Sequence, residues 1–474
     1  MVKETQTLNK KRKTLIALAA ALAVLLGAYF AVTALTRTAD SEDETVLFSC
    51  EADDITGISY TVDGEEIWLV KDSETWKYAT DETFPLDGQK AQALAAAASE
   101  VTVTRKLEPK EEKEAYGLKT PKTKITVSLL NGTSAVFEIG NYNATTDSYY
   151  MMMEGDNNLY LTSSDIATKF ASSLLELASA GQLPESFENG SVTSVTIEDA
   201  ENKTQITTPV TMKTYTDGFK WQLNIGDITT FADDEAVSKI TGELFSLDLS
   251  ALAAYNADEQ KLKEMGFENA VNVTVKYTYT EKTDDEAEEK KSEGTFALKL
   301  VKADEENCYY VHIDGDSGVY KCASSDVKSI TEASKETLET KKIININIDT
   351  VDSMTVEYGG NSYEVTFERT DEETTAKIDG KRVGKSYLEG FIQDLNLLEC
   401  EGKAENETQG ESELKVTFLR NKNDGFKKVT LVFTSYDSSF MSASLLDGGG
   451  KLVNFRDVES LKDSFDDILL QAEQ

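Results

Sequence analysis

One pattern recurs three times along this 474-residue chain, and it constrains the fold more than any other feature. The clearest copies are residues 149–166 and 309–327, and a looser copy spans residues 440–461. Each copy combines two apolar runs, a turn of Gly, Asp and Asn, and a Ser or Asp before a third run, which predicts a β-hairpin that leads into a capped helix. Internal repeats of this kind indicate a chain built from similar units.

The segments upstream of each hairpin also follow one order. A short alternating strand comes first, predicted at residues 55–60, 192–197 and 351–356. An amphipathic helix with a core-facing stripe follows, predicted at residues 86–101, 232–247 and 384–398. Strands of alternating apolar and polar residues come next, which predicts antiparallel sheets with one buried face. These strands are predicted at residues 124–130, 135–139, 271–280, 295–301, 414–420 and 429–435.

We therefore predict an α+β fold of three tandem β-rich repeats, each with an antiparallel sheet and packed helices. The predicted units are residues 53–180, 191–332 and 343–474. Residues 181–190 form a turn-rich linker, and residues 331–342 form a second boundary with helical potential. The charged run at residues 281–294 predicts a solvated hairpin tip.

A run of 22 residues, 14–35, carries no charged side chain. A helix of this length spans the hydrocarbon layer of ~30 Å, whereas the apolar stretch of a cleaved signal peptide has only ~7 to 15 residues. We therefore predict a retained transmembrane helix. Residues 1–13 form a basic tail and residues 36–52 an acidic linker, so the positive-inside rule predicts a single-pass membrane protein with a cytoplasmic N-terminus and an extracellular C-terminal region.

The formal net charge of −37 limits the classes of partner. Binding to nucleic acid or adsorption to anionic lipid requires clustered Lys and Arg, so the charge argues against both. It favours a soluble surface, cation-rich surroundings or a basic partner.

Few residues suggest chemistry. The one histidine, His312, lies in an alternating strand, and we expect it to be half exposed. Residues 314–318 and 154–158 are similar to calcium loops, but neither segment offers the set of about six oxygen ligands that calcium requires. Asp, Asn and Gly are also the residues that tight turns require. Cys308 and Cys322 flank a hairpin, where a disulfide could form, although two buried thiols are the alternative. We predict no catalytic residue, no metal ligand and no cofactor.

A set of motifs in the first predicted unit resembles a known family. In chain order they are Trp76, residues 84–87, 101–105 and 115–121, Ile139-Gly140, Tyr149-Tyr150 and residues 159–161. Together they are similar to the bacterial family called domain of unknown function 4340. The resemblance implies one N-terminal membrane helix and work beside gliding-motility-like ABC transporters, and it implies no catalytic residue. Trp76 and Trp221 are expected to lie in strands and in the core.

These observations favour a non-enzymatic, membrane-anchored extracytoplasmic protein, an accessory or scaffold subunit of an envelope complex such as an ABC exporter. The first alternative is a surface module that binds a ligand or a cation on its acidic sheets. The second is a cell-wall hydrolase that uses two carboxylates, because 85 Asp and Glu residues leave any spacing available.

Overall fold

The computed structural model describes residues 45–211, 218–282, 289–369, 374–404, 412–421, 427–445 and 450–472. The chain divides into two compact units, Met1–Ala180 and Gly181–Gln474. The predicted unit 53–180 ends at the same residue as the first compact unit, and the predicted linker 181–190 lies inside the second. The predicted membrane helix, residues 14–35, is outside the described residues. Within the described ranges, no helix is both long and apolar enough to cross a membrane.

The first compact unit contains an eight-stranded antiparallel sheet, the first sheet, in the order β4-β3-β2-β7-β8-β9-β10-β6. Its strands are β2 Ile55–Val62, β3 Glu65–Asp72, β4 Thr75–Tyr78, β6 Arg105–Leu107, β7 Thr123–Leu129, β8 Ser134–Asn143, β9 Ser148–Met153 and β10 Leu159–Thr162. A separate pair, β1 Thr45–Ser49 and β5 Glu100–Val103, is also antiparallel. The helices are η1 Ala52–Asp54, α2 Gly88–Ser99, α3 Ser164–Lys169 and η2 Leu175–Leu177.

The second compact unit begins with a nine-stranded sheet, the second sheet, in the order β14-β13-β12-β11-β16-β17-β18-β19-β15. Its strands are β11 Ser191–Glu198, β12 Lys203–Thr207, β13 Gln222–Ile225, β14 Ile228–Phe231, β15 Ala251–Ala254, β16 Val271–Lys282, β17 Glu289–Lys302, β18 Cys308–Ile313 and β19 Val319–Ala323. The helices are α4 Glu185–Glu188, α5 Asp234–Phe245, α6 Glu259–Glu264, η3 Phe267–Asn269, η4 Ser324–Val327, α7 Lys328–Thr331 and α8 Lys335–Leu338.

The remaining sheet, the third sheet, also has nine strands, in the order β23-β22-β21-β20-β25-β26-β27-β28-β24. Its strands are β20 Val351–Tyr358, β21 Asn361–Arg369, β22 Thr374–Ile378, β23 Lys381–Val383, β24 Gly402–Lys403, β25 Ser412–Arg420, β26 Lys428–Ser435, β27 Phe440–Leu445 and β28 Lys451–Asn454. The helices are η5 Ile348–Thr350, α9 Lys385–Leu397 and α10 Phe455–Ala472.

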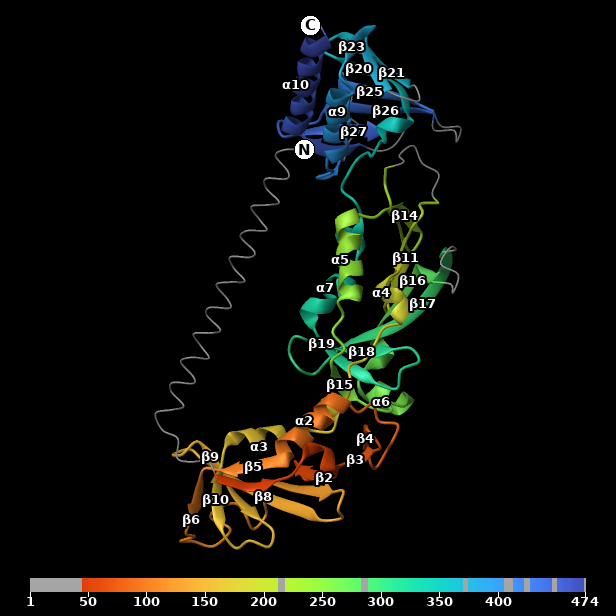
Figure 1. Ribbon diagram of the computed structural model, residues 1–474. Coiled ribbons are helices and arrows are strands. Elements are labelled where there is room, and N and C mark those ends of the chain that lie inside the picture. Colours follow the sequence, from red (N-terminus) through yellow and green to blue (C-terminus); the bar gives the residue numbers. More distant parts are fainter. Residues whose placement is uncertain are drawn as a thin grey trace. The chain divides into compact units, whose positions relative to one another are not determined.

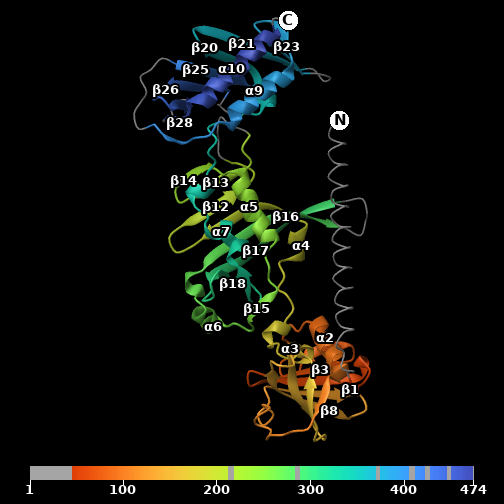
Figure 2. The same ribbon diagram turned by 90° about the vertical axis from the view of Figure 1, so that its left-hand side faces the viewer.

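The three sheets place corresponding strands in the same positions. The first strand of each, β2, β11 or β20, lies between the next strand in sequence and the long strand that follows the main helix. A short strand that comes after that helix, β6, β15 or β24, lies at the opposite edge. In the third sheet, α9 and α10 lie side by side over one face (Figures 1 and 2).

The predicted helices form because each has one apolar stripe, and an aspartate caps the start of two of them. In α5, Val237, Ile240 and Leu244 are buried, and in α9 the buried stripe includes Phe391 and Leu395. The carboxylate of Asp233 accepts hydrogen bonds from the backbone N–H groups of Glu235 and Ala236, and Asp87 caps α2 in the same way. These bonds satisfy backbone donors that the first turn of a helix leaves open.

Three sequence-based expectations need correction. The prediction that residues 281–294 form a hairpin tip was wrong in part. β17 already begins at Glu289 and pairs with β16, and Glu281 lies opposite Lys290. Phe187, in the predicted linker, is 1% exposed and stacks on Phe245 at 4.3 Å between ring centroids, so this segment supplies core. Trp76 is buried in a strand as predicted, but Trp221 is half-buried and directly precedes β13.

Candidate functional site

Part of the motif set of the first predicted unit meets on the face of the first sheet opposite α2, whereas Trp76, Val101 and Ile139 lie in the main core. Residues 108–122, which we call the first strap, connect β6 to β7 and contribute Tyr116 and Leu118 to a small apolar cluster there. Met152 and Leu159 complete its buried part, and the rings of Tyr116 and Tyr150 meet edge to face at 5.0 Å between centroids. The first sheet therefore has a main core under its helices and a second, smaller core under the strap.

Two glycines allow the first strap to lie directly on β8. The N–H of Asn141 donates to the carbonyl of Tyr116 at 2.8 Å. A Cβ at Gly140 would lie 2.2 Å from that same carbonyl oxygen, so only glycine permits the approach. Gly117 has φ +73°, a left-handed conformation that disfavours other residues. The motif glycines at positions 117 and 140 are therefore two sides of one contact.

The second sheet has a corresponding segment, residues 255–270, which we call the second strap. Gly266 has φ +88° and the next residue, Phe267, is buried against Val319 and Ala254. The ring of Phe267 lies 6.0 Å from that of His312, centroid to centroid, in the position that Met152 has in the first sheet. The two straps therefore cover equivalent places on their sheets.

His312 is 9% exposed, so the expectation of a half-exposed histidine was wrong. Its Nδ1 lies 3.0 Å from the carbonyl oxygen of Gly318. The strand pattern could not predict this burial, because Phe267 of the second strap packs against His312 and lies 45 residues earlier in the chain.

The two segments that are similar to calcium loops are tight turns in which an aspartate bonds a tyrosine. Asp156 accepts from the Tyr160 hydroxyl at 2.6 Å, and Asp316 accepts from the Tyr320 hydroxyl at 2.9 Å and the Gly318 N–H at 2.8 Å. The Tyr160 hydrogen bond lowers the pKa of Asp156, and burial, with the bond to Asp316, raises the pKa of Tyr320. In the described part of the chain, no three His, Cys, Asp or Glu side chains are placed to hold a metal ion.

Cys308 and Cys322 are free thiols in the structure. Cys308 pairs with Ala323 and Cys322 with Tyr309, a register that is one residue away from direct pairing. Because successive side chains of a strand point to opposite faces, the two sulfur atoms lie on opposite sides of the second sheet. Burial raises the pKa of the Cys322 thiol to about 12.

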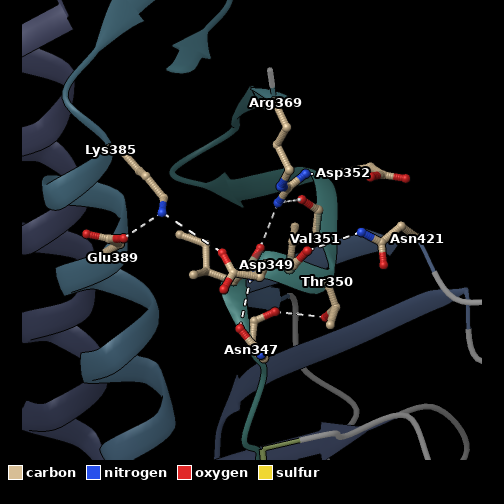
Figure 3. Close-up of polar contacts among 10 residues, drawn as sticks. Asn347, Asp349, Thr350, Val351, Asp352, Arg369, Lys385, Glu389 and Asn421 are labelled. Carbon is tan, nitrogen blue, oxygen red and sulfur yellow. Dashed lines mark hydrogen bonds and ion pairs between the residues drawn. The ribbon is translucent and has the colours of Figure 1, made fainter. Parts of the chain in front are cut away.

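A polar network fixes the turn η5, through which the chain leads into the third sheet. One guanidinium nitrogen of Arg369 donates to the backbone carbonyls of Ile348, at 2.8 Å, and of Val351, at 2.5 Å. From the other side, Asn421 donates from its backbone to Thr350 at 2.8 Å and from its side chain to the carbonyl of Asp349 at 3.1 Å. Figure 3 shows both groups aimed at the backbone of the turn.

Lysine and aspartate side chains extend this network to the helix layer. Lys385 of α9 lies 2.9 Å from Glu389, in the same helix, and 3.9 Å from Asp349, in η5 (Figure 3). Arg369 also lies 3.7 Å from the exposed carboxylate of Asp352. Exposed pairs of this kind contribute only ~0 to 1 kcal/mol each, whereas the hydrogen bonds from Arg369 and Asn421 give the backbone carbonyls of the turn a partner. Sequence reasoning missed this network, because nothing in the pattern around Arg369 points toward a turn 20 residues earlier.

Two adjoining hollows lie beside α7. One, of about 650 Å³, is lined by Lys302, Glu305 and Tyr309 among others, and the second has a volume of about 590 Å³. Lys328 and Glu332 line both. Both hollows have lysines as well as carboxylates on their walls, and carboxylates are the more numerous in each.

In the first strap, Gly117 and Gly140 allow a close backbone contact and the ring of Tyr116 meets that of Tyr150 edge to face, so motifs that are distant in the sequence lie together. A family model, Domain of unknown function (DUF4340), matches residues 76–211 and 221–417. The chain belongs to this family. The first DUF4340 match runs from β4 of the first sheet through β12 of the second, and the other ends in β25 of the third. No curated protein and no solved structure matches the chain.

The DUF4340 matches therefore include both straps and the lead-in turn η5. The chemistry available at these places is hydrogen bonding and apolar packing that hold segments in position. The contacts of the first strap and of Arg369 hold these segments against their own sheets.

Proposed function

We propose that this protein is a non-enzymatic, single-pass membrane protein whose large C-terminal region lies outside the cell and serves as an accessory or scaffold subunit of an envelope complex such as an ABC exporter. The observation that carries the proposal is the recurrence of one strand order in three successive sheets. Proteins built from repeated units commonly present extended binding surfaces. The uncharged run at residues 14–35 with its basic flank supports the anchor.

We further propose that the three sheets are diverged copies of one unit. Asp87 and Asp233 cap the main helix of the first and second sheets with the same two kinds of bond. Asp156 and Asp316 bond a tyrosine four residues ahead in the same hairpin. A short helical turn, η1, α4 or η5, precedes the first strand of every sheet. Shared ancestry accounts for agreement at this level of detail better than separate origins.

The charge of the chain supports a particular kind of partner. Residues 1–13 contain five basic side chains and one acidic, a net charge of +4, so the rest of the chain carries a net charge of −41. Such a surface repels nucleic acid and anionic lipid and attracts basic protein surfaces. The resemblance to proteins that work beside ABC transporters makes the extracellular loops of a transporter subunit the first partner to test.

Co-purification tests the partnership. Full-length protein with an affinity tag is isolated from detergent-solubilised membranes of the native host, and the recovered proteins are identified by mass spectrometry. We expect a transporter subunit in near-stoichiometric amount. A matched variant in which residues 14–35 are replaced by an unrelated membrane helix should retain the partner, because the proposed contact lies outside the membrane. Recovery of the tagged protein alone would contradict the partnership.

The anchor has a separate test. In one assay, isolated membranes are extracted with alkaline carbonate. In a second assay, intact cells are treated with a protease. We expect the protein to stay in the membrane fraction and to lose its C-terminal region to the protease. Release by carbonate would remove the anchor from the proposal, whatever the result of the co-purification.

A further inference from the structure

The ribbon formed by β16 and β17 extends beyond the rest of the second sheet (Figures 1 and 2). β11 pairs with β16 only as far as Thr278, and β18 pairs with β17 only from Leu298 onward. Among the described residues, no strand pairs with residues 289–296 along the edge of β17 that faces away from β16. A two-stranded ribbon is only marginally stable alone in water, and an open edge is a template for another strand. A further strand can therefore add at this place.

The backbone groups of this edge have a defined orientation. The carbonyl of Ala297, the next residue of β17, accepts from the Asp314 N–H at 3.0 Å on the β18 side. Because the backbone groups of alternate residues in a strand point to the same side, the N–H and C=O groups of Lys291, Glu293 and Thr295 point away from β16. These three residues supply the donors and acceptors that an added strand would bond.

The side chains along this edge are balanced in charge, unlike those of the chain as a whole, whose net charge is −37. From residue 290 to 296, β17 carries Lys290, Lys291 and Glu293, and Glu281 of β16 lies 3.4 Å from Lys290. Lys291 and Glu293 are exposed, and neither forms an ion pair with another described residue. A second acidic chain can therefore approach this ribbon with less of the repulsion that the rest of the surface imposes.

A second copy of this chain fits the edge in one register. When two copies of a strand pair antiparallel about a twofold axis, opposite residues lie on the same face, so one residue of β17 lies on the axis. An axis at Lys290, Lys291 or Glu293 places that residue against its own copy, so like charges meet. An axis at Gly294 forms no pair of opposite charges. An axis at Ser292 places Lys291 of each copy opposite Glu293 of the other.

We propose that residues 290–296 of β17 bind the same residues of a second copy, with Ser292 on the twofold axis, so that the two ribbons join in the strand order β16-β17-β17-β16. Each copy contributes one Lys291 and one Glu293, which gives two cross-strand pairs of opposite charge. The N–H and C=O groups of both residues bond across the contact. In strand addition, main-chain hydrogen bonds give affinity and side chains give specificity. This inference goes beyond the proposed scaffold role, because it names a second copy as a partner whether or not a transporter subunit also binds.

Ser292→Cys tests the register in membranes that contain the full-length protein. In the proposed pairing, Ser292 faces its own copy in a non-hydrogen-bonded pair, whose Cα atoms lie about 4.5 Å apart, within the range of about 4.4 to 6.8 Å that a disulfide requires. Mild oxidation should link at least half of the variant into a dimer that a reducing agent separates.

Thr280→Cys, an exposed position on β16, is the matched control. In the proposed pairing the two copies of Thr280 lie three strand spacings apart, at least ~14 Å, which is too far for a disulfide. This variant should therefore give no more linked dimer than the native chain, which carries the same four native cysteines.

Charge variants in the Ser292→Cys background test the ion pairs. Lys291→Glu should lower the yield of linked dimer at least fivefold, because two carboxylates then face each other on both sides of the axis. Glu293→Lys should lower it as much by placing two lysines opposite each other. This variant makes the chain less acidic, so a general effect of net charge predicts the opposite result. The double variant with both substitutions restores the pairs and should restore the yield.

Lys299→Glu is the control for a charge change in the same strand, because β18 occupies the edge of β17 beside it, with His312 opposite. It should leave the yield unchanged, and circular dichroism of each purified variant checks that the fold is retained. A Ser292→Cys yield no higher than that of Thr280→Cys would overturn the proposal. So would single charge variants that link as well as their parent, or a double variant that fails to restore the yield. The anchor and the transporter partnership have their own tests and are unaffected by these results.

Discussion

Glycine positions at the straps are the clearest case in which one residue decides local structure. Gly140 is required by a carbonyl oxygen that would lie 2.2 Å from any Cβ, and Gly117 by both its positive φ and its contact with Asn141. Gly64, Gly132 and Gly242, in contrast, would have no atom within 4 Å of an added Cβ. The difference separates glycines that the fold needs from those that it tolerates.

Gly140→Ala should therefore lower the free energy of unfolding. Forcing one extra carbon into a packed site typically costs ~1 to 3 kcal/mol, and here the opposing atom is backbone and cannot move as a side chain could. Gly242→Ala is the matched control, because nothing lies within 4 Å of a Cβ at this helix position, and alanine should stabilise α5 by roughly 0.5 to 1 kcal/mol. Urea denaturation followed by circular dichroism measures both. Equal midpoints for the two variants would mean that the strap does not contribute to stability.

Several residue-level features could not be predicted from the sequence, for definite reasons. The burial of His312 depends on Phe267, which a local pattern cannot bring beside it. The separation of Cys308 from Cys322 depends on a one-residue register that symmetric spacing in the sequence does not fix. The bonds of Arg369 run to backbone carbonyls, which leave no trace in side-chain patterns.

At the scale of elements, periodicity predicted well because burial of one face leaves a direct mark on sequence. The three main helices and the first strand of every sheet are where the three-and-four spacing and the alternation predict them. Strand ends were less accurate, and the β16–β17 hairpin extends well beyond its predicted length. Glu281 lies opposite Lys290, 3.4 Å apart, and this cross-strand pair of opposite charges is compatible with strand structure. Sheet order could not be read from any of these patterns.

The capping aspartates give a test at this scale. Asp233→Ala should lower stability by about 1 kcal/mol, the typical cost of losing an N-cap, because the N–H groups of Glu235 and Ala236 lose their acceptor. Asp234→Ala removes the neighbouring carboxylate, which makes only a 3.7 Å surface pair with Lys220, and should change stability by less than 0.5 kcal/mol. Calorimetric melting compares them. A larger loss from Asp234→Ala than from Asp233→Ala would refute the assignment of the cap.

At the scale of the whole molecule, charge is the dominant property. With 85 acidic and 48 basic side chains, like charges meet over much of the surface, and this repulsion opposes the compact state. The pairs that relieve it are mostly exposed, such as Lys203 with Glu198 at 2.8 Å. Repulsion between exposed charges is screened over ~8 Å at physiological ionic strength.

Salt should therefore stabilise the protein. Raising sodium chloride from 20 to 200 mM should raise the melting temperature of the full-length protein by a few degrees, because screening weakens net repulsion more than it weakens the scattered ion pairs. Differential scanning fluorimetry at fixed pH measures the shift, and sucrose of equal osmolarity is the control for non-ionic effects. A fall in melting temperature with salt would mean that the ion pairs outweigh the repulsion.

The strand pair β1–β5 has a consequence for where the protein can act. β1 begins at Thr45 and is held by β5, and Phe48 packs on Phe137 at 5.5 Å between ring centroids. With residues 14–35 in the bilayer as proposed, only nine residues separate the start of β1 from the membrane. Fully extended, nine residues span at most about 32 Å. The first sheet would then stay within a thin layer at the cell surface. In that layer it would encounter other membrane proteins more often than freely diffusing molecules.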